Sequence, residues 1–116
     1  WGMPSMQIDL KQEGNVIIIS PLGRIDSSTS PAVERACDEQ IARGMAKLLF
    51  DLAHVDYVSS AGLRVFLVAG KKAHKAGGRI ALCNLQPTVR EILAIAGFDR
   101  ILTTAASRGE GLAKLI

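Results

Sequence analysis

The sequence predicts a single α/β domain with a mixed central sheet of about five strands and about four helices. Two continuous apolar runs, 47–52 and 79–83, are each flanked by stretches with helical periodicity. Strands that alternate with helices in this way favour parallel pairing at the centre of a sheet. A length of 116 residues, with 48% hydrophobic and 22% charged residues, fits one domain with one core.

An N-terminal hairpin is expected to precede the parallel strands. Residues 16–20 are continuous and β-branched, and Gly14-Asn15 suits the tight turn that joins two antiparallel strands. The first helix is expected to have Ser30 as its N-cap and Pro31 in its first position, and to end before Gly44. The elements expected in this half are strands over 6–10 and 16–20, a bent extended segment over 21–26, and a helix over 31–43.

The second half of the chain is expected to alternate strands and helices. Pro87 suits the first turn of a helix, and Gly97 suits the position after its last turn. The expected elements are strands over 47–52, 79–83 and 101–104, and helices over 59–76, 87–96 and 107–115. We place the domain at 6–116 and interpret residues 1–5 as a cloning remnant or a disordered N-terminus, because Trp1-Gly2 precede the first methionine.

The composition argues against several classes of ligand and partner. Two cysteines and two histidines, with no CxxC motif, leave a zinc site almost no ligands, so we expect no metal and no cofactor. A net charge of +3 and four aromatic residues beyond Trp1 argue against a nucleic-acid surface. No apolar run approaches the roughly 18 residues of a membrane span, so we expect a cytoplasmic protein without membrane contact.

No catalytic motif is present, so we expect no enzyme and no catalytic residue. The sequence has no P-loop and no GxSxG elbow, and no motif supports a catalytic triad built on His54 or His74. Asp51 ends a predicted central strand, as the phosphoacceptor of a receiver domain does, but the acidic pair that binds magnesium in such domains is missing. We therefore expect Asp51 only to end its strand.

Two serines lie where a predicted helix begins, at the sheet edge where ligands bind in open α/β sheets. Ser59 is predicted to be the N-cap, with its hydroxyl accepting a hydrogen bond from the first turn. Ser60 would then occupy the first helical position with its hydroxyl free for solvent. A phosphate on Ser60 would lie beside unpaired backbone N–H groups and the positive end of the helix dipole, so the fold would tolerate it.

The same helix is expected to present one cationic face, on which Ser60 and Val68 also project. At 100° per residue, four cations fall within about 100° of arc. These cations are Arg64, Lys71, Lys72 and Lys75. Two interpretations remain open: the face is a phosphorylation-controlled switch, or the serines only start a helix and the lysines form a solvated face.

Four motifs along the chain occur together, in this order, in one known family. They are Gly-Arg-Ile-Asp at 23–26, Asp-Tyr-Val-Ser-Ser-Ala-Gly-Leu-Arg-Val-Phe-Leu at 56–67, Gly-Gly at 77–78, and the stretch 87–98. Together they resemble the anti-sigma factor antagonists, the STAS-domain family, over nearly the whole chain, and so imply a STAS-like fold. In the commoner family signature the phosphorylated serine directly precedes the glycine, whereas Ala61 occupies that place here.

The resemblance implies a non-catalytic regulator in a partner-switching pathway. Such an antagonist binds an anti-sigma serine kinase of the ATP-binding type while unphosphorylated, is switched off when that kinase phosphorylates it, and is restored by a metal-dependent phosphatase. The implied phosphorylation site is Ser60, with Ser59 as the second choice. The residues expected to contact the partner are Asp26, Ser59, Ser60, Gly62, Arg64, Val68 and Lys71.

Alternatives stay open for one residue and for the function. Asp26 matches the family's acid near the phosphorylation site, but it suits a simple turn cap equally well. Ala61 favours a STAS domain that is not phosphorylated and serves as an adaptor subunit of a larger complex, such as a lipid-transport complex or a signalling scaffold. Lys11 and Gln12 near the outer strand argue mildly against pairing with a second copy, so we expect a monomer.

Overall fold

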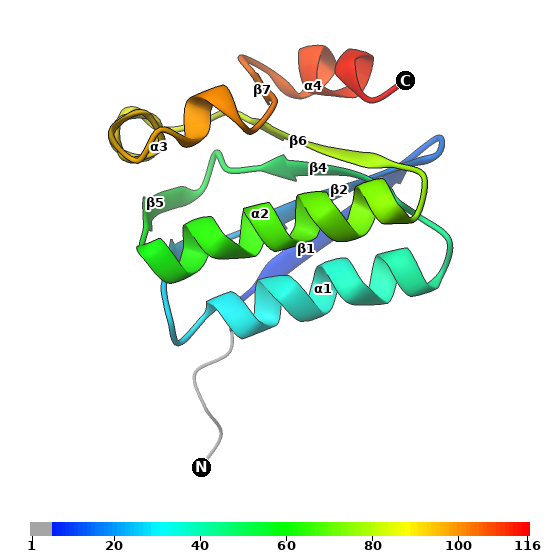
Figure 1. Cartoon of the computed structure of the whole chain (residues 1–116), viewed down its shortest axis with the longest axis horizontal. Coiled ribbons are helices and arrows are strands. Elements are labelled where there is room, and N and C mark those ends of the chain that lie inside the picture. Colours follow the sequence, from blue (N-terminus) through cyan, green and yellow to red (C-terminus); the bar gives the residue numbers. More distant parts are fainter. Residues whose placement is uncertain (1–5) are drawn as a thin grey trace.

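The central sheet is mixed and has five strands, as the sequence predicts. The computed structural model describes residues 6–116 (Figure 1). The sheet has the order β1-β2-β4-β6-β7; β1 and β2 pair antiparallel, and the other neighbours pair parallel. Its strands are β1 (Ile8–Glu13), β2 (Val16–Pro21), β4 (Lys47–Asp51), β6 (Arg79–Cys83) and β7 (Thr104–Ala105).

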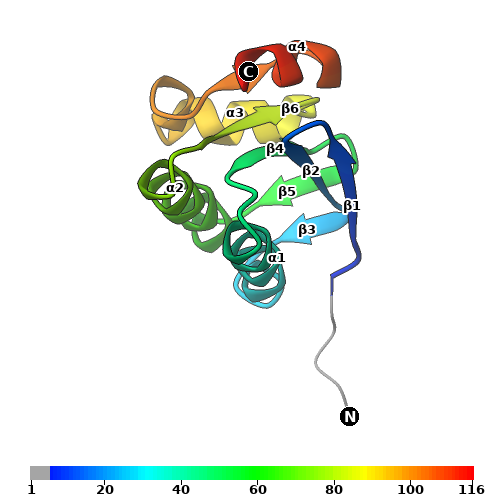
Figure 2. The ribbon, with the colours of Figure 1, turned by 90° about the vertical axis from the view of Figure 1, so that its right-hand side faces the viewer.

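Four α-helices cover the two faces of this sheet. They are α1 (Ser30–Ala42), α2 (Ser60–Lys75), α3 (Pro87–Ile95) and α4 (Arg108–Lys114). Helices α1 and α2 lie side by side with their N-termini at the same end (Figure 1), and Figure 2 views both nearly end-on. Helix α4 lies on the other face, so the fold has three layers. The predicted number of helices is confirmed.

The strands alternate between two apolar clusters because successive side chains of a strand point to opposite faces. On β2, Ile17 and Ile19 belong to the cluster under α1, α2 and α3, whereas Ile18 belongs to the cluster under α4. The larger cluster contains Phe50 and Phe66, whose rings meet edge to face at 5.1 Å between centroids. Both rings are fully buried, so α2 is fixed against the centre of the sheet.

A second, two-stranded sheet lies at the end of the fold where α2 begins. Its strands β3 (Gly23–Ile25) and β5 (Val55–Val58) pair parallel. The sequence predicts 21–26 only as bent extended chain and does not predict β5, because that strand is short and carries two exposed residues, Asp56 and Tyr57, at its centre. This small sheet joins the segment before α1 to the segment before α2.

The predicted bounds of the first and last strands and the predicted N-cap of α1 are wrong. The first strand begins at Ile8 rather than at residue 6. The first strand continues through polar residues to Glu13 and stays paired with β2 up to Val16. Polar residues are tolerated there because β1 is an edge strand with exposed side chains. The last strand begins at Thr104, because a 3₁₀ turn, η1 (Phe98–Arg100), occupies the residues before it and the backbone N–H of Leu102 bonds to the carbonyl of Phe98 at 2.9 Å. The N-cap of α1 is Thr29 rather than Ser30.

Asp51 joins three segments that are distant in sequence. Its carboxylate, 6% exposed, accepts hydrogen bonds from Asn84 at 3.1 Å and from the backbone N–H of Ala53 at 3.1 Å, and it forms a 2.8 Å ion pair with Arg108. Burial alone would raise the pKa of Asp51, but the bonds from Asn84, Ala53 and Arg108 outweigh it and lower the pKa below its usual value. Asp51 therefore also fixes α4 to the sheet, which the sequence does not predict.

The lowered pKa of Asp51 makes its contribution to stability depend on pH. The contribution is complete above the unfolded-state pKa, about 3.9, and is lost as pH falls through the lower folded-state pKa. We expect Asp51→Asn to lower the free energy of unfolding by about 1–3 kcal/mol at pH 7. Urea unfolding of both proteins at pH 7 and pH 3 should show this difference shrinking in acid, and a constant difference would contradict the account.

Candidate functional site

Ser59 caps the N-terminus of α2, as the sequence predicts. Its backbone is extended, with φ −81° and ψ 176°, and its hydroxyl accepts a hydrogen bond from the backbone N–H of Gly62 at 3.3 Å. The backbone N–H of Ser59 donates to the carbonyl of Ile25 at 2.8 Å, so β3 fixes where the helix begins. The half-buried Ser59 hydroxyl is therefore occupied by the fold.

Ser60 is the first residue of α2, and its side chain is exposed. Among residues 6–116, no hydrogen-bond partner is found for the Ser60 hydroxyl, in contrast to Ser59. The backbone N–H groups of the first turn lack partners within the helix, which gives this end a partial positive charge. The site can accept a phosphoryl group without breaking an existing side-chain contact.

Asp26 orders the loop between β3 and α1, beside the start of α2. One carboxylate oxygen accepts from the Ser28 hydroxyl at 2.7 Å, from the Ser28 backbone N–H at 2.9 Å and from the Thr29 backbone N–H at 3.2 Å. These bonds, with those of Ser28 first, hold the pKa of Asp26 below its usual value. The turn-cap interpretation is thus confirmed by geometry. The backbone N–H of Ser30 donates to the carbonyl of Asp26 at 2.8 Å, so Ser30 already belongs to the first turn of α1 and Thr29 is the N-cap.

Gly62 lies where α2 approaches β3 and β5 most closely. A Cβ atom on Gly62 would come within 2.8 Å of the Ile25 carbonyl oxygen, the Ile25 Cγ2 atom and the Val58 Cγ1 atom. Gly62 is itself buried against Ile25 and Val58, so it presents no side chain to a partner. The glycine of the sequence motif is required here by close backbone approach.

A groove of about 770 Å³ runs between α1 and α2, from Ser60 to Lys72 along α2. Arg64 and Val68, one and two turns beyond Ser60, line the same groove, so the structure brings these three predicted residues together. The opposite wall comes from the start of α1 and includes Ser30 and Glu34. The groove therefore combines a free hydroxyl, a half-buried aliphatic side chain and an exposed guanidinium.

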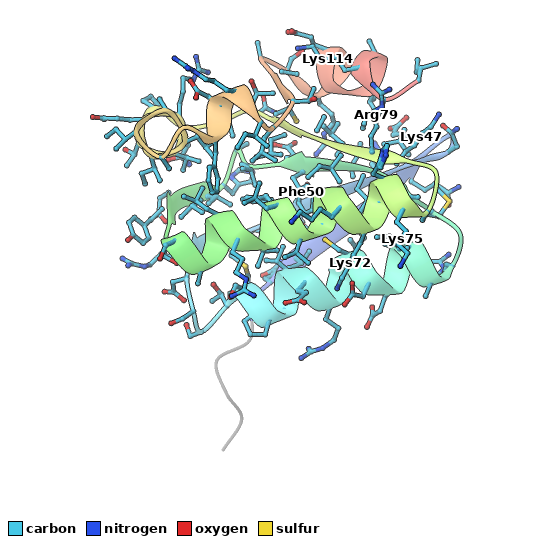
Figure 3. All side chains as sticks on the ribbon, viewed as in Figure 1. Lys47, Phe50, Lys72, Lys75, Arg79 and Lys114 are labelled. Carbon is cyan, nitrogen blue, oxygen red and sulfur yellow. The ribbon has the colours of Figure 1, made fainter. Side chains whose placement is uncertain are left out.

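The predicted cationic face is divided by the packing of the helices. Lys72 extends from α2 toward α1 (Figure 3) and pairs with Asp38 at 2.9 Å and Glu34 at 3.6 Å. The hydrogen bond that Lys72 donates to Asp38 is the largest cause that raises the pKa of Lys72. Lys71 is exposed but lines a different groove, away from α1. Among residues 6–116, Arg64 is thus the predicted cation that is exposed and lines the groove with Ser60.

Two residues near the site are missed by the sequence reasoning. The guanidinium of Arg24 lies 4.6 Å from the centre of the Tyr57 ring, and its Nε lies 3.7 Å from a carboxylate oxygen of Asp26. Arg24 on β3 is the register partner of Tyr57 on β5. Predicting the parallel pairing of these two strands would have placed the two residues side by side. Arg24 and Tyr57 are both exposed and extend the polar surface around Asp26.

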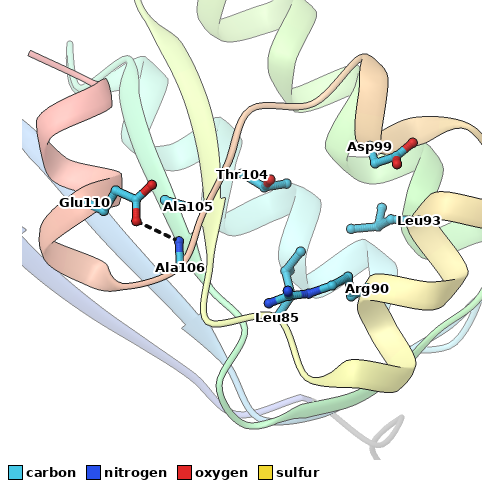
Figure 4. Close-up of a pocket in the computed structure, with 8 residues that line it drawn as sticks. All are labelled: Leu85, Arg90, Leu93, Asp99, Thr104, Ala105, Ala106 and Glu110. Atoms are coloured by element: carbon cyan, nitrogen blue, oxygen red, sulfur yellow. Dashed lines mark hydrogen bonds between the residues drawn. The ribbon is translucent and has the colours of Figure 1, made fainter.

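A separate hollow of about 440 Å³ lies between α3, η1, β7 and α4 (Figure 4). Its charged residues are Arg90, Asp99 and Glu110. The Glu110 carboxylate accepts from the Ala106 backbone N–H at 3.2 Å, so it serves the turn before α4. None of the residues that the sequence predicts for partner binding lines this hollow.

Neither metal ligands nor a membrane span is found in the part of the chain that the structure describes. Within 6–116, no group of three or more His, Cys, Asp or Glu side chains is placed to bind a metal ion. No helix in this range is long and apolar enough to cross a membrane. Both cysteines are buried, and burial raises the pKa of each thiol to about 12.

The chain is similar to curated anti-sigma factor antagonists over most of its length. It is 34% identical over 103 residues to a protein of Bordetella bronchiseptica described as a candidate anti-sigma factor antagonist, BtrV, covering 89% of each chain. It is 30% identical over 108 residues to the anti-sigma-B factor antagonist of Bacillus subtilis, covering 93% of this chain and 98% of the relative.

Solved structures have the same fold, and a family model matches most of the chain. A crystal structure of an anti-sigma factor antagonist from Mycobacterium paratuberculosis has a TM-score of 0.85 at 23% identity and covers 95% of this chain and 93% of its own. The Bacillus protein SpoIIAA in its phosphorylated form gives a TM-score of 0.70 at 17% identity, over 93% and 98% of the two chains. The model of the STAS domain matches residues 7–111. The chain therefore belongs to the STAS-domain family, with anti-sigma factor antagonists among its relatives.

Proposed function

We propose that this chain is an anti-sigma factor antagonist that binds an anti-sigma serine kinase of the ATP-binding type. The observation that carries the proposal is the position of Ser60: it is exposed, it opens α2, and its hydroxyl lies free in a groove lined by Arg64 and Val68. The relatives that cover most of the chain are named as antagonists of anti-sigma factors. The family of antagonists is non-enzymatic, and the chain acts by binding.

Phosphorylation of Ser60 switches this binding off in the proposed mechanism. A phosphate brings a charge of about −1.5 to −2 to the rim of the groove. The first turn of α2 tolerates this charge, because its free N–H groups attract anions. A partner surface matched to the free hydroxyl and to Val68 would instead have to desolvate the charge. Arg64, one turn along α2, is within reach of the phosphate and so becomes less available to the partner.

The proposed phosphorylation site is Ser60 rather than Ser59. The Ser59 hydroxyl already accepts the cap bond from Gly62, and the residue is half-buried. A kinase would have to break that bond to reach Ser59, whereas Ser60 can be reached directly. A metal-dependent serine phosphatase then restores the binding form. The proposed contacts with the kinase are Asp26, Ser59, Ser60, Arg64 and Val68, with Gly62 packed beneath them. Lys71, which the sequence also predicts as a contact, lines a different groove and lies outside the proposed kinase surface.

A second candidate function rests on Ala61. This alanine directly precedes Gly62, where the commoner motif has the phosphorylated serine. The alternative is therefore a STAS adaptor subunit that is not phosphorylated and holds together a larger complex, such as one for lipid transport or signalling. In that case the chain would co-purify with a stable partner, and Ser60→Asp would not change the binding.

Phosphopeptide mapping distinguishes the two functions. The chain and its Ser59→Ala and Ser60→Ala variants are purified from their native host during growth and under stress. Their intact masses are measured and their phosphopeptides are mapped. We expect one phosphoryl group that appears in one condition and is absent only in Ser60→Ala. Loss only in Ser59→Ala would move the site by one residue, and a chain that is unmodified in every condition would favour the adaptor.

A further inference from the structure

A second groove, of about 360 Å³, lies on the side of α2 that faces away from α1. Its walls are the C-terminal half of α2, the start of β6, and the segment 101–103 that leads into β7. It shares no lining residue with the groove at Ser60. The two grooves are therefore separate features on opposite sides of one helix.

The floor of this second groove is apolar. Ile80 and Leu102 are buried at 7% and 8% exposure, and Leu67 is half-buried beside them. Ile101 forms one wall and is 66% exposed. Leu67, Ile80, Ile101 and Leu102 thus line one apolar depression. Because Ile101 is mostly exposed, a partner can contact its side chain directly.

The rim of the same groove is cationic. Lys71 and Arg79 line it together with His74, and among residues 6–116 neither Lys71 nor Arg79 forms an ion pair. Arg79 makes only a 3.3 Å hydrogen bond to the Lys114 carbonyl. Lys72, on the α1 side, already has two carboxylates from α1. The positive charge at this groove thus lacks a counter-charge within the described chain.

The cationic region continues beyond the groove. A further hollow of about 310 Å³ shares His74 and Arg79 with it and reaches Lys47. Figure 3 shows Lys47 and Arg79 at the same end of the fold, next to the last turn of α2. Asp99 lies in η1, just before the segment 101–103, but it lines the separate hollow together with Arg90 (Figure 4). An occupant of the groove would therefore meet positive charge around an apolar floor.

We infer that this second groove is a docking site for an acidic amphipathic helix of a partner protein. The apolar side chains of that helix would enter between Leu67 and Ile101, and its carboxylates would pair with Lys71 and Arg79. Helix-in-groove recognition uses such a combination of apolar anchors and complementary charge. The chain could then bind one partner at Ser60 and a second partner on the other side of α2.

Two synthetic helical peptides test this inference. Both carry leucine on one face; the first carries glutamate on the other faces, and the second carries lysine there. The glutamate peptide should shift the backbone amide NMR signals of Leu67, Ile80, Ile101 and Thr103, and the lysine peptide should not. Raising the salt concentration should weaken the binding, because exposed charges are screened. Equal binding of the two peptides, or no shift at these residues, would overturn the inference.

Matched variants locate the binding on the surface. Ile101→Asp should weaken binding of the glutamate peptide about tenfold or more, because it replaces an apolar anchor by a charge. Arg79→Glu should weaken it about as much, because it replaces a complementary charge at the rim by one that repels the peptide. Ile95→Asp is the control, since Ile95 is 80% exposed on α3 and does not line the groove. If Ile101→Asp bound the peptide as tightly as Ile95→Asp, the groove would not be the docking site.

The same peptide titration tests whether the second groove is independent of the proposed kinase surface. Ser60→Asp should bind the glutamate peptide like the parent chain, because Ser60 lines only the other groove. Conversely, Ile101→Asp should leave binding of the anti-sigma kinase unchanged. A Ser60→Asp chain that loses the peptide would contradict two separate surfaces, whereas failure of the kinase to bind the parent chain would leave the peptide result intact.

Discussion

Val68→Asp is expected to weaken binding of the anti-sigma kinase by about 30-fold or more, or ~2 kcal/mol. Val68 is half-buried and lines the groove between Ser60 and Lys72. A carboxylate there would have to lose water when the partner covers it, and it would replace an apolar contact by a charge. Titration of the purified kinase with the parent and variant chains, by calorimetry, measures the change.

The fold should survive this substitution, which makes the binding result interpretable. Val68 belongs to neither apolar cluster of the core. Circular dichroism and urea unfolding check that the variant is folded. Ile95→Asp serves as the matched control, because it also replaces a helical aliphatic residue by aspartate, on α3 and away from the groove. Parent-like affinity in Val68→Asp would remove this face of α2 from the proposed interface.

Gly62→Ala is expected to lower the free energy of unfolding by about 1–3 kcal/mol, the range of overpacked sites. The added Cβ would meet the carbonyl oxygen of Ile25 at 2.8 Å, together with two buried side-chain atoms of Ile25 and Val58. Backbone cannot move aside cheaply here, because the same Ile25 carbonyl accepts the Ser59 N–H bond. Urea unfolding of the two proteins measures the difference.

Gly70→Ala is the matched control on the same helix. Its added Cβ would meet only Ile80 side-chain atoms, at 3.7 Å and 3.8 Å, which is ordinary contact. Alanine is favoured over glycine inside a helix by about 1 kcal/mol, so this variant should be as stable as the parent or more stable. If Gly62→Ala were equally well tolerated, the close approach of α2 to β3 would not fix the position of Ser60.

The sequence predicts the fold well where the role of a residue depends only on its neighbours in the same helix or strand. The apolar runs of β4 and β6 indicate parallel central strands, and the serines before α2 indicate its first turn. Ser59 is a good example, because an N-cap depends on residues only three positions away. Such local signals are available without knowledge of the tertiary structure.

The features that the sequence does not predict depend on contacts between distant segments. Asp51 pairs with Arg108, 57 residues later, which only the docking of α4 brings about. Lys72 is a member of the predicted cationic face, but its pairing with Asp38 depends on how α1 packs against α2. Strand β5 is short and half exposed, so its pairing with β3 is visible only in the folded chain.

The central claim is that phosphorylation of Ser60 controls binding of the anti-sigma kinase, and it is tested most directly by one affinity measurement. The purified kinase is titrated with the chain before and after stoichiometric phosphorylation, beside Ser60→Ala treated in the same way. We predict tight binding of the unmodified chain, a loss of about 30-fold or more on phosphorylation, and unchanged binding of treated Ser60→Ala. Equal affinity of the phosphorylated and unmodified chains would contradict the account.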